Sequence, residues 1–252
     1  MRLLITNIGI LAGIDNHRKL RLSGKEMSQF ETLTDAWLLV EDGRFSKWGC
    51  MAAMPAGGIS ADQTVDAHGG CVMPSWCDPH THIVYAGSRE GEFVDKIRGL
   101  SYAEIAKRGG GILNSADLLH TFSEDELYRE AMHRAEEIMR KGTGCVEIKS
   151  GYGLTTEDEL KMLRVIRRIK ESTPLRIKST FLGAHAVGRG YTQADYVDLV
   201  VNEMIPEVGR EKLADFVDVF CDEGFFTPAE TERILEAAAK WGMKPKIHAD
   251  EL

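Results

Sequence analysis

The fold can be predicted from one stretch, Pro74-Ser75-Trp76-Cys77-Asp78-Pro79-His80-Thr81-His82, where an apolar run ends in two histidines one residue apart. We predict a buried strand over 72–77, which places both histidines just past its C-terminal end. In extended chain, residues i and i+2 point to the same side, so the two imidazoles can converge on one point. Paired imidazoles suit a divalent metal, and catalytic zinc sites commonly use three protein ligands.

Two histidines in this spacing are by themselves a weak indication, because histidines also form hydrogen bonds within loops. Three features favour a metal site: the strand before the pair, Asp78 two residues before the first histidine, and further histidines after later strands. Asp78 can fix the tautomer of an imidazole, or it can be a turn residue before Pro79.

Length and composition limit the class of protein. A chain of 252 residues forms one large α/β domain or two smaller ones. Its formal net charge of -8 argues against binding to nucleic acid, which normally needs a basic face. No apolar segment approaches the roughly 20 residues that a membrane helix needs, and the N-terminus does not resemble a signal peptide. The five cysteines form no C-x-x-C pair, which is typical of a reducing compartment. We therefore expect a soluble, cytoplasmic protein with no nucleic-acid or membrane partner, and a homodimer remains open.

Residues 1–70 are predicted to form a small, incomplete β-sandwich-like domain. Strands are expected at 3–10, 36–40 and 44–48, and Glu41-Asp42-Gly43 has the composition of a hairpin turn.

Residues 71–252 alternate between predicted strands and helices. Ser or Thr recurs with an acidic residue three positions later, which is the signature of a helix N-terminus. These pairs are Ser101 with Glu104, Ser123 with Glu126, Thr156 with Glu159, Thr192 with Asp195, and Thr227 with Glu230. Short apolar strands are expected between the helices, at 145–148, 175–182, 216–220 and 245–247.

Such alternation predicts either a doubly wound sheet or a (β/α)8 barrel, with about five β/α units in this chain. No G-x-G-x-x-G motif opens a helix, which removes the main support for a dinucleotide-binding fold. Each predicted strand is followed by chemically capable residues, and barrels carry their catalytic groups there. These groups are His80 and His82, Lys149 to Tyr152, His185, Asp222 with Glu223, and His248 with Asp250 and Glu251.

The sequence resembles the amidohydrolase superfamily and, within it, the imidazolonepropionase family. The superfamily resemblance rests on Asp78-Pro79-His80-Thr81-His82 and His248. The family resemblance rests on Gly87-Ser88-Arg89-Glu90, Glu92-Phe93, Gly109-Gly110-Gly111-Ile112, the run 146–154, Phe181-Leu182-Gly183-Ala184-His185 and His248-Ala249-Asp250-Glu251. Two small departures are Ser75, where a glycine is common, and Asp222, where the family tends to have a glutamate.

The resemblance implies a TIM-type barrel behind a small β-rich domain, with one zinc or iron ion as cofactor. It implies hydrolysis of 4-imidazolone-5-propanoate, a small-molecule substrate, to N-formimidoyl-L-glutamate in histidine degradation. His80, His82 and His248 would be metal ligands. Glu251 would orient water, move a proton, or bind the substrate by holding its ring nitrogens. Arg89 would bind the propionate carboxylate, and Tyr152 and His185 would bind the substrate, with His185 also able to polarise the ring carbonyl.

Each of these roles has an alternative. Arg89 can form a surface ion pair with Glu90 or Glu92, Tyr152 can cap the core, and His185 can be structural. Lys149 is expected to be structural, because the family resembles the single-metal type.

Family members are longer than this chain and use a later aspartate as a further metal ligand, so we expect the chain to be an N-terminal portion of a longer enzyme. Two other functions stay open. One is a different cyclic-amide hydrolase or deaminase of the superfamily, and the other is a non-catalytic metal-binding fragment.

Overall fold

A computed structural model describes residues 1–15, 19, 21–101, 104 and 111–250. The chain divides into two compact units, Met1–Ser75 and Trp76–Leu252, each built around a sheet of its own. The mixed α/β class predicted from the sequence is confirmed. Within the described residues, no helix combines the length and the apolar character that crossing a membrane requires.

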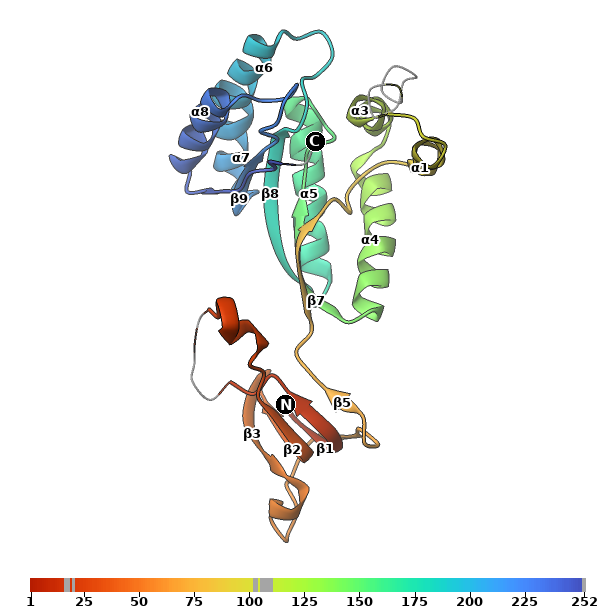
Figure 1. Ribbon diagram of the computed structural model, residues 1–252, viewed down its shortest axis with the longest axis vertical. Coiled ribbons are helices and arrows are strands. Elements are labelled where there is room, and N and C mark those ends of the chain that lie inside the picture. Colours follow the sequence, from red (N-terminus) through yellow and green to blue (C-terminus); the bar gives the residue numbers. More distant parts are fainter. Residues whose placement is uncertain (16–18, 20, 102–103, 105–110, 251–252) are drawn as a thin grey trace. The chain divides into compact units, whose positions relative to one another are not determined.

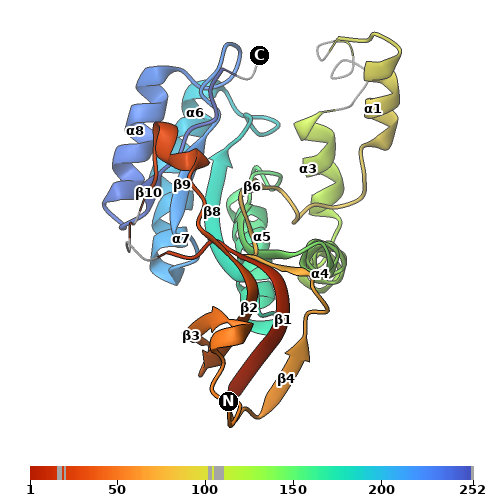
Figure 2. The same cartoon turned by 60° about the horizontal axis from the view of Figure 1, so that its bottom comes forward.

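The first unit is a five-stranded sheet in the order β3-β2-β1-β4, with β5 also paired to β1 (Figure 2). The pairs β1–β2 and β2–β3 are antiparallel, whereas β4 and β5 run parallel to β1. The three predicted strands are confirmed, and two more were not predicted. The strands are β1 (Arg2–Ala12), β2 (Thr32–Glu41), β3 (Arg44–Cys50), β4 (Gln63–Asp66) and β5 (Cys71–Val72).

The turn between β2 and β3 has the predicted hairpin conformation. Asp42 and Gly43 have φ angles of 50° and 75°. Positive φ at both central residues is the mark of the two-residue turn whose twist matches that of the flanking strands. No α-helix lies among the described residues of this unit, which holds only the short 3₁₀ turns η1 (Gly24–Ser28) and η2 (Met51–Ala53).

The second unit is a parallel sheet whose strands follow chain order without a reversal, β6 to β10. Sequential order of this kind results when every crossover turns the same way, as in a barrel, whereas a doubly wound sheet reverses its order at a switch point. The strands are β6 (Trp76–Thr81), β7 (Thr143–Lys149), β8 (Arg176–Ala184), β9 (Phe216–Val219) and β10 (Lys244–Pro245).

One face of this sheet is apolar and covered by helices. Val146 and Ile148 of β7, like Val217 of β9, are fully buried in the main hydrophobic core. Helices α4, α5 and α8 pack along these strands (Figure 1). The helices and helical segments of the unit are α1 (Glu90–Ile97), α3 (Ile112–His120), α4 (Glu124–Arg140), α5 (Thr156–Ser172), α6 (Gln193–Leu199), η3 (Val200–Met204), α7 (Ile205–Glu211) and α8 (Pro228–Ala239).

Successive side chains of a strand point to opposite faces, so the residues between these apolar ones form the other face of the sheet. Several of them are charged. Glu147, Lys149 and Asp218 occupy the alternate positions of β7 and β9 and are buried despite their charge. We call this surface the polar face of the sheet. The histidines of the candidate site come from the C-terminal ends of other strands of this sheet, β6, β8 and β10.

Most predicted helix starts have the expected caps. Ser123 and Thr227 each form a complete capping box with the glutamate three residues later. Thr192 accepts a hydrogen bond from the backbone N–H of Asp195. Ser101 exchanges hydrogen bonds with Glu104, although most of the residues that follow lie outside the described part of the chain.

One predicted cap is wrong by a residue. The cap of α5 is Thr155, whose side chain accepts from the N–H of Asp158. Glu159, predicted to complete the cap, instead accepts hydrogen bonds from the backbone N–H groups of Gly151, Gly153 and Leu154. A local sequence pattern could not distinguish neighbouring threonines that are both followed by an acid.

The opening strand of this unit was also misplaced. The predicted buried strand over 72–77 is replaced by two pieces, because β5 pairs in the first unit and β6 begins only at Trp76. His80 therefore lies within β6 rather than past it. The strand is largely exposed, since it has a single described neighbour, β7, at the edge of the sheet. An apolar run alone does not show which sheet a strand joins.

Candidate metal centre and its cavity

Three of the predicted residues converge at the C-terminal ends of the strands. His80 is the next-to-last residue of β6, and His82 lies directly after the strand. His248 forms a parallel bridge with Phe220 beyond β9. Each offers a ring nitrogen, and these candidate ligand atoms all lie within 4.8 Å of one another. The Nε2 atoms of His80 and His248 are 3.1 Å apart.

The geometry and chemistry of these rings fit a metal ion. Two nitrogen ligands of one tetrahedral zinc ion lie about 3.3 Å apart, given Zn–N bonds of about 2.0–2.1 Å. Nδ1 of His82 is buried and has no hydrogen-bond partner among the described residues. A buried polar atom without a partner is costly, and a ligand would satisfy it.

Burial also keeps these imidazoles in the neutral form that binds metals. Burial, reinforced by the nearby His185, lowers the pKa of His82 to about 2. The pKa of His80 is lowered as well, chiefly by burial and next by the Lys149 charge. Neither ring must lose a proton at neutral pH before it can coordinate an ion.

His185 and Tyr152 lie beside the three histidines. The ring of His185 stacks on that of His82, with centroids 5.4 Å apart and planes inclined by 16°. The Tyr152 ring is 5.2 Å from His185 and 5.6 Å from His82. Burial lowers the pKa of His185 to about 4, although its hydrogen bond to Gly151 acts in the opposite direction.

A hydrogen bond fixes the tautomer of His185. Nδ1 lies 2.8 Å from the carbonyl oxygen of Gly151. A carbonyl oxygen only accepts, so Nδ1 carries the proton. The neutral ring therefore offers Nε2 as a hydrogen-bond acceptor.

These rings line a cavity of about 370 Å³. Its wall combines the imidazoles with cationic and aromatic side chains, namely His80, His82, Arg89, Lys96, Ile112, Tyr152, His185, Phe220, Phe225 and His248. Phe220 and Phe225 stack with centroids 4.0 Å apart, which gives one side of the cavity an apolar surface. A cavity with convergent polar groups and apolar walls is the usual form of a small-molecule site.

Arg89 lines the cavity and also forms the ion pair with Glu92 that was predicted as its alternative role. Its Nε is 2.8 Å from Oε2 of Glu92, and the other carboxylate oxygen of Glu92 accepts from the N–H of Gly111. Glu92 therefore ties the start of α1 to the start of α3. Glu251 lies outside the described residues, and Asp222 is not among the residues of the cavity wall.

The sequence reasoning missed the residues that support the site. Asp218 lies behind His248, with Oδ2 3.0 Å from Nδ1. Burial raises the pKa of Asp218, but hydrogen bonds from His248 and Lys149 outweigh it and bring the value to about 2. The available signal in the sequence was Asp218 itself, a charged residue between the apolar residues of the short strand β9.

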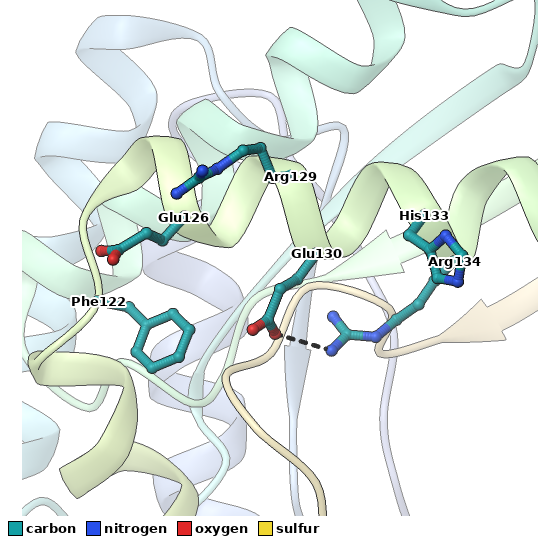
Figure 3. A pocket seen from close by; sticks show the side chains of 6 residues that line it. All are labelled: Phe122, Glu126, Arg129, Glu130, His133 and Arg134. Carbon is teal, nitrogen blue, oxygen red and sulfur yellow. Dashed lines mark hydrogen bonds and ion pairs between the residues drawn. The ribbon is translucent and has the colours of Figure 1, made fainter.

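A second cavity, of about 580 Å³, lies along α4, and none of the three convergent histidines lines it (Figure 3). Glu130 and Arg134 on its wall pair at 3.0 Å. Arg134 also donates to the carbonyls of Ile83 and Tyr85 and lies over the Tyr85 ring, 3.6 Å from its centroid. Arg134 thus anchors the segment that directly follows His82, which gives this cavity wall a structural role.

Gly151 offers a test of how the loop holds His185. Its φ is 113°, and a Cβ placed there would lie 3.0 Å from Nδ1 of His185 and 3.0 Å from Leu182. We expect Gly151→Ala to lower the free energy of unfolding by about 1–3 kcal/mol through backbone strain and to displace His185. Thermal unfolding measures the first effect, and the His185 imidazole signals in an NMR spectrum measure the second.

Gly190→Ala is the matched control for this prediction. Gly190 also has a positive φ, of 85°, but nothing lies within 4 Å of a Cβ built on it. We expect Gly190→Ala to lower the free energy of unfolding through backbone strain and to leave the His185 signals unchanged. If both variants leave the His185 signals unmoved, the proposed contact is wrong.

Comparison with known proteins finds relatives that match the whole chain. A protein from Christiangramia forsetii named imidazolonepropionase is 52% identical over 253 residues, matching 100% of the chain and 61% of its own length. Along its whole length, the chain is similar to proteins named imidazolonepropionase. A second imidazolonepropionase, from Flavobacterium psychrophilum, is 53% identical over 254 residues, with the same coverage of both chains. The chain thus spans about three fifths of these family members, 61% in both cases. No protein-family profile matches the chain.

Solved structures share the fold of this chain. A 5-methylcytosine deaminase from Klebsiella pneumoniae liganded with 5-fluorocytosine aligns with a TM-score of 0.64 at 16% identity, covering 100% of this chain and 52% of that one. An atrazine chlorohydrolase from Arthrobacter aurescens TC1 complexed with zinc aligns with a TM-score of 0.56 at 14% identity, covering 97% and 52%. At such identities the likeness concerns the fold alone.

Proposed function

We propose that the protein carrying this chain hydrolyses the ring C–N bond of 4-imidazolone-5-propanoate to N-formimidoyl-L-glutamate in histidine degradation. The observation that carries this proposal is 52% identity to an imidazolonepropionase along the entire chain. The activity is proposed for a protein of the relatives' length, of which the chain spans 61%. The cavity beside three convergent histidines supports it.

The division of the chain into domains is a second proposal. We propose that residues 1–70 belong to a small β-rich domain and that 71–252 form about five units of a (β/α)8 barrel. The support is the parallel sheet in chain order, with its apolar face under helices and its polar face opposite. The resemblance adds that the chain corresponds to an N-terminal portion of the family members.

His80, His82 and His248 would hold one metal ion, zinc or iron, since imidazole accommodates both. When bound, such an ion supplies Lewis-acid chemistry that makes water reactive at neutral pH. The support is the spacing of the ring nitrogens, the neutral state of His80 and His82, and the buried Nδ1 of His82.

Arg89, Tyr152 and His185 would bind the substrate from the cavity wall. Arg89 presents a planar pair of donors that suits the propionate carboxylate. His185, with its proton on Nδ1, would accept a hydrogen bond from a ring N–H of the substrate through Nε2. This tautomer favours an accepting role over polarisation of the ring carbonyl. Glu251, which lies beyond the described residues, keeps its proposed role in proton transfer.

Turnover assays test the function. The full-length protein, loaded with zinc or iron, is offered imidazolone propionate, dihydroorotate, hydantoin and guanine in parallel. We expect hydrolysis of imidazolone propionate alone. Preferred turnover of another substrate would favour a different cyclic-amide hydrolase or a deaminase, and stoichiometric metal without turnover would favour a non-catalytic metal-binding protein.

Arg89→Lys tests the carboxylate contact. Charge-assisted hydrogen bonds contribute about 1.5–3 kcal/mol each, so we expect KM for imidazolone propionate to rise about 10- to 100-fold. The comparison substrate is the 5-ethyl analogue, which lacks the carboxylate. If Arg89 only pairs with Glu92, the variant will lose the same factor on both compounds.

A further inference from the structure

The polar face of the sheet holds a group of buried charges that the proposed reaction does not use. The side chains of Glu147, Lys149 and Asp218 are exposed by only 5%, 1% and 2%. Nζ of Lys149 lies 2.7 Å from Oε1 of Glu147 and 2.8 Å from Oδ2 of Asp218. Burying three charges is costly unless they pair, and here a lysine from β7 reaches past β8 to a carboxylate on β9.

This group connects directly to one of the three convergent histidines. Oδ2 of Asp218, the oxygen that Lys149 contacts, also lies 3.0 Å from Nδ1 of His248. An ionised carboxylate only accepts hydrogen bonds, so Nδ1 of His248 carries the proton. In the neutral form of the ring, this tautomer leaves Nε2 free to bind an ion, and it is this atom that lies 3.1 Å from Nε2 of His80.

The remaining members balance the charge of the group. Nζ of Lys246 is 3.2 Å from Oε1 of Glu147 and 2.8 Å from the carbonyl oxygen of Pro79, the residue before His80. Two lysines thus face two carboxylates, and the ring of His248 completes the set. Lys246 also ties the chain just before His248 to the chain just before His80.

We infer that Asp218, held by Lys149, is a positioning residue that fixes His248 in the tautomer and orientation needed to bind the ion. The inference rests on the proposed metal site and adds to it the residues that make one ligand competent. Partners behind a metal-binding histidine typically change metal affinity 10- to 100-fold when they are replaced.

The test compares Asp218→Asn with Asp215→Asn in the full-length protein. The asparagine at 218 keeps the shape of aspartate but carries no charge. An amide oxygen in the place of Oδ2 leaves the NH2 group at the buried position of Oδ1, which has no hydrogen-bond partner among the described residues. Asp215 lies just before β9, pairs with Lys178 at 2.7 Å, and has no described contact with the histidines. Competition with a chromophoric chelator gives the Kd for Zn²⁺ of each protein.

We expect Kd to rise about 10- to 100-fold for Asp218→Asn and to stay within about twofold for Asp215→Asn. A second measurement uses the metal-free wild-type protein, where ¹⁵N shifts should show His248 protonated on Nδ1. An unchanged Kd for Asp218→Asn, or a His248 protonated on Nε2, would overturn the inference. The wild-type measurement decides the matter if Asp218→Asn does not fold.

The proposed function can fail separately. A wild-type protein that hydrolyses imidazolone propionate while Asp218→Asn binds zinc normally refutes only the positioning role. A wild-type protein that binds zinc with the expected loss in Asp218→Asn, but hydrolyses no imidazolone propionate, supports the positioning role and refutes the reaction.

Discussion

His82→Ala is expected to abolish stoichiometric metal binding by the full-length protein. His82 is partly buried, and its buried Nδ1 lacks a partner among the described residues. Four-ligand zinc sites reach about 10–16 kcal/mol in total, so losing one ligand costs on the order of 3 kcal/mol, or at least about a hundredfold in Kd. Metal content after dialysis and the Kd from chelator competition measure the effect.

The control is His133→Ala on α4, an exposed histidine that lies on the wall of the second cavity. It removes one imidazole from the protein without touching the three that converge. Retention of one ion per chain with the wild-type Kd in His82→Ala would show that the histidines do not share a metal. Hydrolysis should fall in parallel with metal content, because the ion supplies the reactive water.

The parts of the fold that were predictable are those set by local chemistry. A serine or threonine followed three residues later by an acid satisfies the free N–H groups of a helix end, whatever lies beyond it, and Ser123 and Thr227 behave in this way. The Asp42-Gly43 turn was predictable for the same reason, since few residues adopt its positive φ angles.

The histidines of the site were predictable because parallel strands end at one edge of a sheet, so residues that follow successive strands must meet. Their supporting residues were not. The sequence allows Glu159 to be either the capping acid of α5 or the acceptor for N–H groups of the loop after β7. Only the fold shows that Thr155, and not Thr156, caps the helix. Asp218 and Lys149 lie 69 residues apart, and no local pattern pairs them.

Contacts between distant parts of the chain also explain why the predicted strand over 72–77 was misplaced. The run around Pro74 is apolar throughout, but β5 pairs with β1 and β6 pairs with β7. Which strand accepts each piece depends on contacts from distant parts of the chain. Periodicity describes a strand's own faces and does not identify its neighbour.

Lys149→Met is expected to lower the free energy of unfolding of the second unit by about 3–5 kcal/mol. Methionine fills a similar volume, so the loss comes from charge rather than from a cavity. Glu147 and Asp218 would remain buried, each having lost the ammonium group that lies within 2.8 Å of it. Hydrogen exchange of the β7 and β9 amides measures this unit without interference from the first.

Lys178→Met is the matched comparison, because it removes a lysine from the neighbouring strand β8. Lys178 is 49% exposed and pairs with Asp215 at 2.7 Å. Exposed ion pairs contribute about 0–1 kcal/mol, since water replaces the lost partner. The two lysines therefore separate the effect of burial from that of pairing.

A loss below about 1 kcal/mol in Lys149→Met would mean that water reaches the polar face of the sheet and solvates the two carboxylates. In that case Asp218 would not need Lys149 in order to hold His248.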